Sequence, residues 1–388
     1  MKKTLLFISL TLISFFGFSQ YPVGHRQITF QDPARSNRSI QTEIYYPGVS
    51  AGESVTAATG AFPIIVFGHG FSMNYDAYLY FKDAMVPDGY IVAFPTTETG
   101  FSPSHSDFGL DLKFLVNKLL SENSNNASPF YTHVGTTSAI MGHSMGGGSS
   151  FLACENNTVP TVMVTFAAAN TTPPSITAAG NVTIPCLVIS GAVDCVAPPA
   201  DHQVPMYNAL ASACKVYISI NNGGHCYFGD YSFYCTFGES TCMPTIPITS
   251  AAQQDVALDY TKLYLDYYLK GNAASWTKFN DSLTVSQRIT YQKNCPTVNV
   301  ETVDFEKFVQ VFPNPVTNDL TIAFPLSIAS NVSMTVLNVL GEKIIEKRIN
   351  SENKIFEEKM NLSSFKSGIY FVEIRTNQFT IIKKIIKE

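Results

Sequence analysis

The sequence predicts an α/β fold with a mostly parallel sheet, followed by a small all-β domain. Between residues 39 and 269, short apolar runs alternate with segments of helical spacing, the order typical of such a sheet. From about residue 309, lysine and glutamate become frequent, cysteine vanishes, and short alternating strands follow one another. We therefore expect a large domain over residues 20–300, a linker over 301–308 and a small antiparallel sandwich over 309–388.

The composition is that of a globular protein, since 14% of the 388 residues are charged and 12% are aromatic. The net charge is −5 and no basic stripe interrupts it, so we exclude nucleic acid as a partner. Residues 1–19 combine a basic start, an apolar middle and Ser19 near a cleavage point, which is typical of a secretory signal peptide. No later segment reaches the roughly 18 apolar residues of a membrane span, so we expect a soluble mature protein.

Continuous apolar runs predict strands buried on both faces, alternation predicts half-buried strands, and a 3.6-residue period predicts helices. Gly271 is expected to end the last helix of the large domain. The predicted strands of this domain are 39–46, 62–67, 90–94, the run that ends at residue 142, 161–166, 183–190 and 214–220. The predicted helices are 107–120, 145–154 and 251–269. In the tail, the predicted strands are 320–324, 332–339, 344–349, 369–375 and 379–386.

A short apolar run that begins at residue 138 ends abruptly in Gly142-His-Ser-Met-Gly146. A serine at a tight strand-to-helix turn needs small residues two positions before and after it, because the neighbouring backbone comes too close for a Cβ. Gly142 and Gly146 meet this need. The turn would expose Ser144 Oγ, and the N–H of Met145 would face a developing acyl oxyanion. The alternative is a glycine-rich turn with an ordinary serine, and the partner residues described next weigh against it.

A serine hydroxyl is a poor nucleophile unless a histidine accepts its proton, and that histidine needs a carboxylate to orient it. After Ser144, only His202 and His225 remain. His225 follows a predicted strand directly, where an active-site loop is expected, whereas His202 lies at a predicted helix start. Asp194 follows the end of a strand after a short turn. It is favoured over Asp201, which also lies at the helix start.

A second oxyanion donor is expected from the loop after the strand 62–67, most plausibly the N–H of Phe71. His69 is expected to hold this loop by hydrogen bonds. His143 is expected to pack behind the serine, and with Tyr227 and Phe228 it is also a candidate for the substrate cleft. The aromatic run that begins at Tyr227 could line an apolar groove or pack on itself.

Eight cysteines in an exported chain indicate disulfides, because the CxxC pairs of a zinc site are absent. Cys195 directly follows the candidate acid and Cys226 the candidate base, so a Cys195–Cys226 bridge is one hypothesis. Pairing of each cysteine elsewhere is the equal alternative. Cys235 and Cys242 could close a small loop of their own. We expect neither a metal nor a cofactor.

With these residues placed, positions 21–280 resemble the α/β-hydrolase superfamily. Within it, they are similar to secreted cutinase-like and poly(ethylene terephthalate) hydrolase-like enzymes, and to the dienelactone-hydrolase and platelet-activating-factor-acetylhydrolase group. The motifs are Gly142-His-Ser-Met-Gly-Gly-Gly148, Asp194-Cys-Val-Ala-Pro198, Asn222-Gly-Gly-His225, Asp32-Pro-Ala-Arg35 and Tyr45-Tyr-Pro47. The resemblance implies that Ser144 is the nucleophile and that Asp194 and His225 are its partners. It also implies Phe71 and Met145 as oxyanion donors, with Phe71 forming one wall of the cleft.

Two features depart from the polyester hydrolases. Those enzymes usually carry a tryptophan in the loop after the strand that follows the serine, where this chain has Phe-Ala-Ala-Ala-Asn over 166–170. The segment 226–247 is also longer than the resemblance implies. Both features weigh against polymer cleavage and leave ester hydrolysis intact.

The tail resembles the type IX secretion sorting domain of Bacteroidetes-type bacteria. The motifs are Val311-Phe-Pro-Asn-Pro315, Val336-Leu-Asn-Val-Leu-Gly341, Leu362, Gly368-Ile-Tyr-Phe-Val372 and the basic end at 383–387. The resemblance implies passage across the outer membrane by the secretion machinery, with the tail removed or used for surface attachment. A carbohydrate- or polymer-binding sandwich is the alternative, weakened by the absence of tryptophan from the tail.

We therefore expect a secreted, monomeric serine ester hydrolase that acts on small or polymeric esters. A peptidase or amidase of the same fold stays open, because the triad chemistry is shared and specificity resides in loops. A surface-binding protein with a vestigial pocket is the third hypothesis.

Overall fold

The computed structural model describes residues 20–242, 246–296, 308–325, 330–351, 355–376 and 380–388. The chain divides into two compact units, Met1–Pro296 and Thr297–Glu388. The predicted signal peptide and most of the predicted linker lie outside the described residues.

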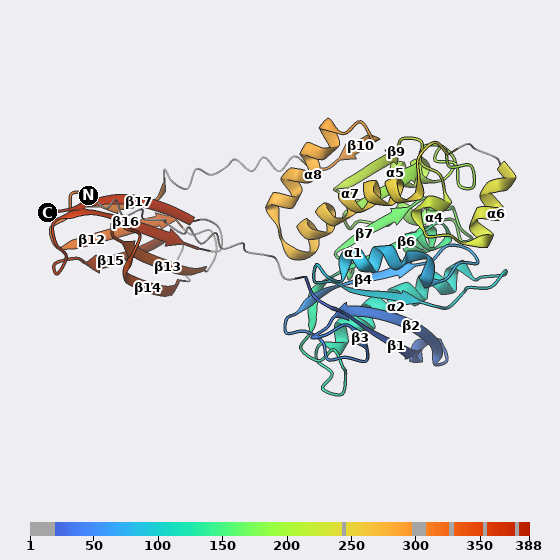
Figure 1. Cartoon of the computed structure of the whole chain (residues 1–388), viewed down its shortest axis with the longest axis horizontal. Helices are drawn as coiled ribbons and strands as arrows, with labels where there is room; N and C mark the ends of the chain where they lie inside the picture. The colour runs from blue at the N-terminus through green and yellow to red at the C-terminus, as the bar shows by residue number, and fades with distance from the viewer. Residues whose placement is uncertain (1–19, 243–245, 297–307, 326–329, 352–354, 377–379) are drawn as a thin grey trace, which may run out of the picture. The chain divides into compact units, whose positions relative to one another are not determined.

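A ten-stranded sheet in the order β10-β9-β8-β7-β6-β4-β5-β2-β1-β3 forms the frame of the first unit (Figure 1). The six strands from β9 to β5 run parallel to their neighbours, whereas β10, β2 and β1 pair antiparallel. This arrangement confirms the predicted α/β class with a mostly parallel sheet. The strands are β1 (Val23–Asp32), β2 (Arg38–Pro47), β3 (Gly52–Glu53), β4 (Phe62–Gly68), β5 (Ile91–Pro95), β6 (Val134–His143), β7 (Val162–Phe166), β8 (Cys186–Gly191), β9 (Lys215–Ile220) and β10 (Ile289–Asn294).

Helices cover both faces of this sheet (Figure 1). One apolar core includes side chains of α2, α3, α4 and α5, and the other includes side chains of α1, α7 and α8. Along β4, Ile64 and Val66 belong to the first core and Ile65 and Phe67 to the second, which explains the uninterrupted apolar run. The helices are α1 (Leu79–Met85), α2 (His105–Glu122), α3 (Met145–Cys154), α4 (Ser175–Ala179), α5 (Gln203–Ala209), α6 (Phe233–Cys242), α7 (Ser250–Lys270) and α8 (Ala273–Val285), with short 3-10 turns at Pro33–Arg35, Tyr75–Tyr78 and Cys226–Phe228.

The predicted strands and helices of this unit are all present, within a few residues at their ends. Gly271 ends α7 in the left-handed conformation, with φ 68°, as expected for a glycine at this position. The sequence did not predict β1, β3, β10, α1, α4, α6 or α8. Of these, α6 contributes to the site described below. None of the described helices combines the length and hydropathy that crossing a membrane requires.

The second unit contains two antiparallel sheets, in the orders β11-β12-β15 and β14-β13-β16-β17. Both sheets contribute side chains to one apolar core, so the predicted antiparallel sandwich is confirmed. The strands are β11 (Gln310–Phe312), β12 (Asp319–Pro325), β13 (Ser330–Leu337), β14 (Lys343–Ser351), β15 (Ile355–Asn361), β16 (Gly368–Arg375) and β17 (Thr380–Lys387), of which β11 and β15 were not predicted.

Three disulfides join cysteines of the first unit: Cys195–Cys242, Cys226–Cys235 and Cys214–Cys295. The hypothetical Cys195–Cys226 bridge is therefore wrong, and so is a loop closed by Cys235 and Cys242. The reason is α6, which begins near Cys235 and ends at Cys242. Cys235 is the partner of Cys226, in the loop of the candidate base, and Cys242 is the partner of Cys195, in the loop of the candidate acid. Cys154 and Cys186 are buried and unbridged.

Replacing Cys214 and Cys295 together by serine is expected to lower the free energy of unfolding by about 2–4 kcal/mol, because the bridge constrains a long loop of the unfolded chain. Trp276 is the single tryptophan and lies in α8, so its fluorescence during urea denaturation reports on the first unit. An unchanged urea midpoint would count against a stabilising bridge at this position.

Candidate active site

Ser144 connects β6 to α3 in a sharp turn, with φ 54° and ψ −117°. This left-handed backbone is strained for a residue with a side chain. A Cβ at Gly142 would lie 2.3 Å from the carbonyl oxygen of Gly146, and a Cβ at Gly146 would lie 2.2 Å from that of Gly68. The predicted need for small residues on both sides of the serine therefore holds in the structure.

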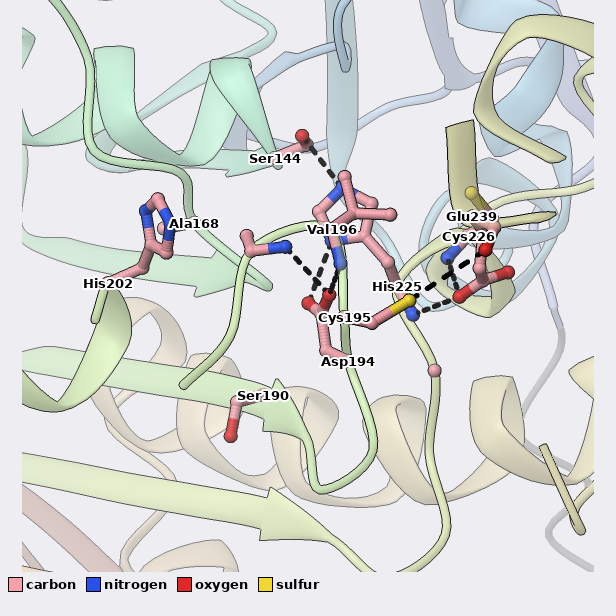
Figure 2. Close-up of polar contacts among 12 residues, drawn as sticks. Ser144, Ala168, Ser190, Asp194, Cys195, Val196, His202, His225, Cys226 and Glu239 are labelled. Carbon is pink, nitrogen blue, oxygen red and sulfur yellow. Dashed lines mark hydrogen bonds and ion pairs between the residues drawn. The ribbon is translucent and has the colours of Figure 1, made fainter. Parts of the chain in front are cut away.

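Three side chains from three strand ends meet beside this turn (Figure 2). Ser144 Oγ lies 2.9 Å from His225 Nε2, and His225 Nδ1 lies 2.7 Å from Asp194 Oδ2. Since the carboxylate accepts the proton of Nδ1, Nε2 is the nitrogen that accepts the serine proton. The structure thus brings together the three residues that the sequence singled out.

Asp194 is held on its other side by the backbone of its own loop. Its Oδ1 accepts hydrogen bonds from the N–H of Val196, at 2.9 Å, and of Ala197, at 2.8 Å (Figure 2). Only 4% of Asp194 and 1% of His225 are exposed, compared with 8% of Ser144. Asp194 and His225 are therefore shielded from water, and Ser144 is the most exposed of the three.

The alternative histidine and acid have other positions. His202 precedes α5 and its Nδ1 accepts a hydrogen bond of 2.8 Å from the N–H of Asn170. Asp201 is exposed in the turn before α5. Neither residue joins the hydrogen bonds between Ser144, His225 and Asp194.

The two expected oxyanion donors lie at the start of α3 and in the loop after β4. Met145 is the first residue of α3, and Phe71 follows β4 by three positions. Among the described residues, no hydrogen bond within the protein uses the N–H of either. His69 fixes the second loop as expected, with Nε2 at 2.8 Å from the carbonyl oxygen of Thr97.

A chain of buried hydrogen bonds connects the loop after β4 to the histidine loop. His143 Nε2 donates to the carbonyl oxygen of His225, at 3.0 Å, so its Nδ1 accepts from the hydroxyl of Tyr78, at 2.9 Å. The same hydroxyl accepts from the N–H of Gly70, at 2.9 Å. Burial, followed by the nearby His225, lowers the pKa of His143 well below its usual range, which agrees with a neutral ring.

An apolar cavity of about 530 Å³ opens above Ser144. The cavity is lined mainly by aromatic and small apolar groups, several of them from α6. The lining residues are Phe71, Met73, Phe101, Ser144, Val196, His225, Phe233, Tyr234, Cys235, Phe237 and Gly238.

Of the expected cleft residues, Phe71 lines this cavity, and His143, Tyr227 and Phe228 do not. His143 is fully buried behind the serine, because its two ring nitrogens are used inside the fold. Phe228 is buried against Phe166 and His143 in the core. The aromatic run thus divides, since its first part packs inside the protein and Phe233 and Tyr234 face the cavity.

Sequence reasoning missed α6 as the source of the cavity wall. Its sequence, Phe-Tyr-Cys-Thr-Phe-Gly-Glu-Ser-Thr-Cys, lacks the apolar stripe of a core helix, and Phe233 and Phe237 are each 62% exposed. The available signal was the spacing of four between these two phenylalanines, which places them on one face of a helix. In the structure their rings stack with centroids 6.2 Å apart.

Comparison with known proteins agrees with this fold. Residues 33–234, more than half of the chain, match the family model described as PET hydrolase-like. The chain belongs to this family. Residues 310–388 match the secretion system C-terminal sorting domain, which places the protein outside the cell or at the cell surface.

Curated relatives include a cutinase from Thermobifida alba, 36% identical over 22% of this chain and 28% of the relative. A bis(hydroxyethyl) terephthalate hydrolase from Streptomyces coelicolor is 27% identical over 47% of this chain and 54% of the relative. A cutinase from Thermobifida fusca is 37% identical over 22% of this chain and 28% of the relative. The chain thus spans from about a quarter to about half of the length of these relatives.

Acidification is expected to destabilise the fold through His143. Because its pKa is lowered in the folded state, below pH 6.5 the unfolded chain gains a proton that the folded chain does not. His143 should then lower the free energy of unfolding by about 1 kcal/mol between pH 6.5 and 5.5, with a slope that approaches about 1.4 kcal/mol per pH unit as the unfolded imidazole becomes fully protonated. His143→Gln keeps an N–H donor but cannot titrate. In this variant the free energy of unfolding, measured by urea denaturation between pH 6.5 and 5.5, should lose the part of its pH dependence that comes from His143. An identical slope in both proteins would contradict a neutral buried His143.

Proposed function

We propose that this protein is a secreted serine ester hydrolase with Ser144, His225 and Asp194 as its catalytic residues. The observation that carries the proposal is the continuous set of hydrogen bonds from Ser144 Oγ through the imidazole to Asp194, at the floor of an apolar cavity. Membership of the PET hydrolase-like family and similarity to proteins named cutinase support the ester bond as the target.

In the first half of the reaction, Ser144 Oγ attacks the ester carbonyl carbon while His225 Nε2 takes the hydroxyl proton. Asp194 stabilises the resulting imidazolium through Nδ1. Collapse of the tetrahedral intermediate breaks the bond to the alcohol oxygen, which receives the proton from His225. A water molecule then attacks the acyl-enzyme by the same steps and releases the acid, with Ser144 restored.

The N–H groups of Phe71 and Met145 are the proposed oxyanion donors. They flank Ser144 from two different segments, and neither is used by an acceptor among the described residues. Donors already fixed in place need no rearrangement as negative charge develops on the carbonyl oxygen. The hydrogen bond from Gly70 to Tyr78 supports the loop that carries Phe71.

The cavity favours an apolar acyl group. Its wall is formed by Phe71, Phe101, Phe233, Tyr234 and Phe237, and no lysine, arginine, aspartate or glutamate is among its lining residues. Aromatic rings can stack on an aromatic acid as well as pack against an alkyl chain. We therefore propose esters of aromatic or medium-chain acids as substrates, with polyesters of such acids as the polymeric candidates.

The proposed enzyme acts as a monomer, because all three triad residues and the cavity wall come from one chain. The sorting domain is proposed to engage the type IX secretion machinery after the signal peptide has directed export. Its removal or its use for surface attachment then decides whether the hydrolase is released or stays at the cell surface.

Ser144→Ala is expected to abolish hydrolysis of p-nitrophenyl butyrate, by at least 10³-fold in kcat, because the nucleophile is lost. A fluorophosphonate probe should label the wild-type protein and leave the variant unlabelled. Labelling without turnover of esters would favour a peptidase or amidase. No labelling of the wild-type protein would favour the surface-binding hypothesis.

Phe237→Ala is expected to raise KM for p-nitrophenyl hexanoate about 3- to 10-fold, because part of the apolar wall is lost. KM for p-nitrophenyl acetate should change less than twofold, since the short acyl group does not reach the wall. Tyr131→Ala is the matched control, because Tyr131 is exposed in the same unit and does not line the cavity. Equal effects on the two esters would contradict the assignment of the wall.

A further inference from the structure

His225 lies in a glycine-containing loop that follows β9. The preceding residues are Asn222, with φ 61°, Gly223 and Gly224, and glycine has more backbone freedom than any other residue. The imidazole nevertheless has to keep both Ser144 and Asp194 within hydrogen-bond distance. Groups outside the loop therefore have to fix its backbone, and the side-chain amide of Gln253 does so at Gly224, where it bonds both the N–H and the carbonyl oxygen at 2.9 Å.

Two side chains from other segments hold the two backbone polar groups of His225. His143 Nε2 donates to its carbonyl oxygen, as described above. On the other side, its N–H donates to Glu239 Oε1, at 2.6 Å (Figure 2). The same carboxylate oxygen is 3.3 Å from the N–H of Cys226. The base is thus held before and after its Cα by groups distant in sequence.

Glu239 is a buried carboxylate on α6, with 6% of its surface exposed, whereas most of that helix is exposed. Burying a carboxylate is unfavourable unless hydrogen bonds compensate for lost hydration, and N–H bonds to a charged acceptor are among the strongest available. Gly224 makes this approach possible, because a Cβ there would lie 2.7 Å from Glu239 Oε1. The glycine before the histidine therefore leaves room for the carboxylate.

The helix that carries Glu239 is joined covalently to the loops of the acid and the base. Cys235 is bonded to Cys226, which follows His225, and Cys242 is bonded to Cys195, which follows Asp194. Glu239 lies between the two bridges. Three connections therefore hold α6 against the residues beside the triad.

The same helix turns Phe233, Tyr234 and Phe237 toward the cavity. Tyr234 also contacts Phe101, another lining residue, edge to face, with ring centroids 5.0 Å apart. The helix α6 thus bonds the backbone of His225 with one side chain, Glu239, and forms part of the cavity wall with three others. Glu239 lies beyond the residues that the family model matches.

We propose that Glu239 is a positioning residue that fixes His225 relative to Ser144, so that the cavity wall and the base form one rigid unit. The inference rests on the proposed ester hydrolase function. Loss of the carboxylate leaves two buried N–H groups, those of His225 and Cys226, without their acceptor. Gln253 still holds Gly224, so the loss loosens the segment that begins at His225. A displacement of about 1 Å at a reacting group can cost on the order of 100-fold in rate.

The test compares Glu239→Ala with Glu239→Gln in the full-length protein. Glutamine keeps a carbonyl oxygen of the same reach, and alanine removes the acceptor. Ser240→Ala is the matched control, because Ser240 is exposed on the same helix. We measure kcat and KM for p-nitrophenyl acetate per active site titrated with the fluorophosphonate, together with Tm and the rate of labelling at Ser144.

The expected result is a 10- to 100-fold loss of kcat in Glu239→Ala with KM within about twofold. The labelling rate should fall in parallel, and Glu239→Gln should recover at least half of the wild-type values. Because values are taken per titrated site, a smaller folded fraction cannot produce this pattern. If misfolding prevents measurement of the alanine variant, Glu239→Met, which has similar length and no oxygen acceptor, takes its place.

Three outcomes would overturn the inference: an unchanged kcat per active site in the alanine variant, a loss equal in the alanine and glutamine variants, or a loss equal in Ser240→Ala. Each still shows a working esterase, so the proposed function survives. A wild-type protein that neither labels nor hydrolyses esters would instead remove the proposed function, and the inference with it.

Discussion

The site depends first on a steric constraint at Ser144. Its left-handed backbone costs roughly 1–3 kcal/mol, so the surroundings must leave no easier conformation. The surroundings do so with backbone hydrogen bonds from the end of β7 and the residues that follow it. The N–H of Ser144 donates to the carbonyl oxygen of Phe166, and its own carbonyl oxygen accepts from Ala169, each at 2.9 Å. With Gly142 and Gly146 packed too closely for any side chain, the serine has one available orientation.

The other residues of the site are held around Ser144 by buried hydrogen bonds rather than by exposed charged groups. Asp194 is buried and its two oxygens are used by the imidazole and by backbone N–H groups. His143 is neutral and links the carbonyl oxygen of His225 to Tyr78 and through it to Gly70. Because these groups lie inside the protein, their dipoles act in a medium that screens them little. The proposed oxyanion loop and the proposed base are thereby held by a common set of bonds.

The parts of this structure that sequence could predict are those with local causes. Apolar runs bounded by glycine and proline predict strands, and the spacing of Gly142, Ser144 and Gly146 predicts a turn that only small neighbours permit. The order of serine, acid and histidine along the chain then limits the partners to a few residues. These features require no knowledge of how distant segments pack.

The parts that sequence could not predict depend on such packing. Cysteine spacing suggested a direct bridge between Cys195 and Cys226, yet each is bonded to a cysteine of α6. The spacing of Phe233 and Phe237 is the one local signal for α6, and it does not place the helix, because its aromatic side is exposed and its buried side is represented by Glu239. For the same reason Phe228 was expected in the cleft, although it lies in the core and Phe237 lines the cavity.

The segment around α6 also links the proposed reaction geometry to a particular substrate preference. If α6 only packed beside the cavity, without bonds to the loops of Asp194 and His225, it could move without an effect on the triad. Here the wall is bonded to both loops and carries the carboxylate that holds the base, so its position and that of His225 are set together. A substitution on the exposed aromatic side of α6 can alter acyl selectivity while Glu239 and the two bridges keep the base in place. The chemistry and the specificity of this fold are therefore separable on one helix, by which face of it a residue occupies.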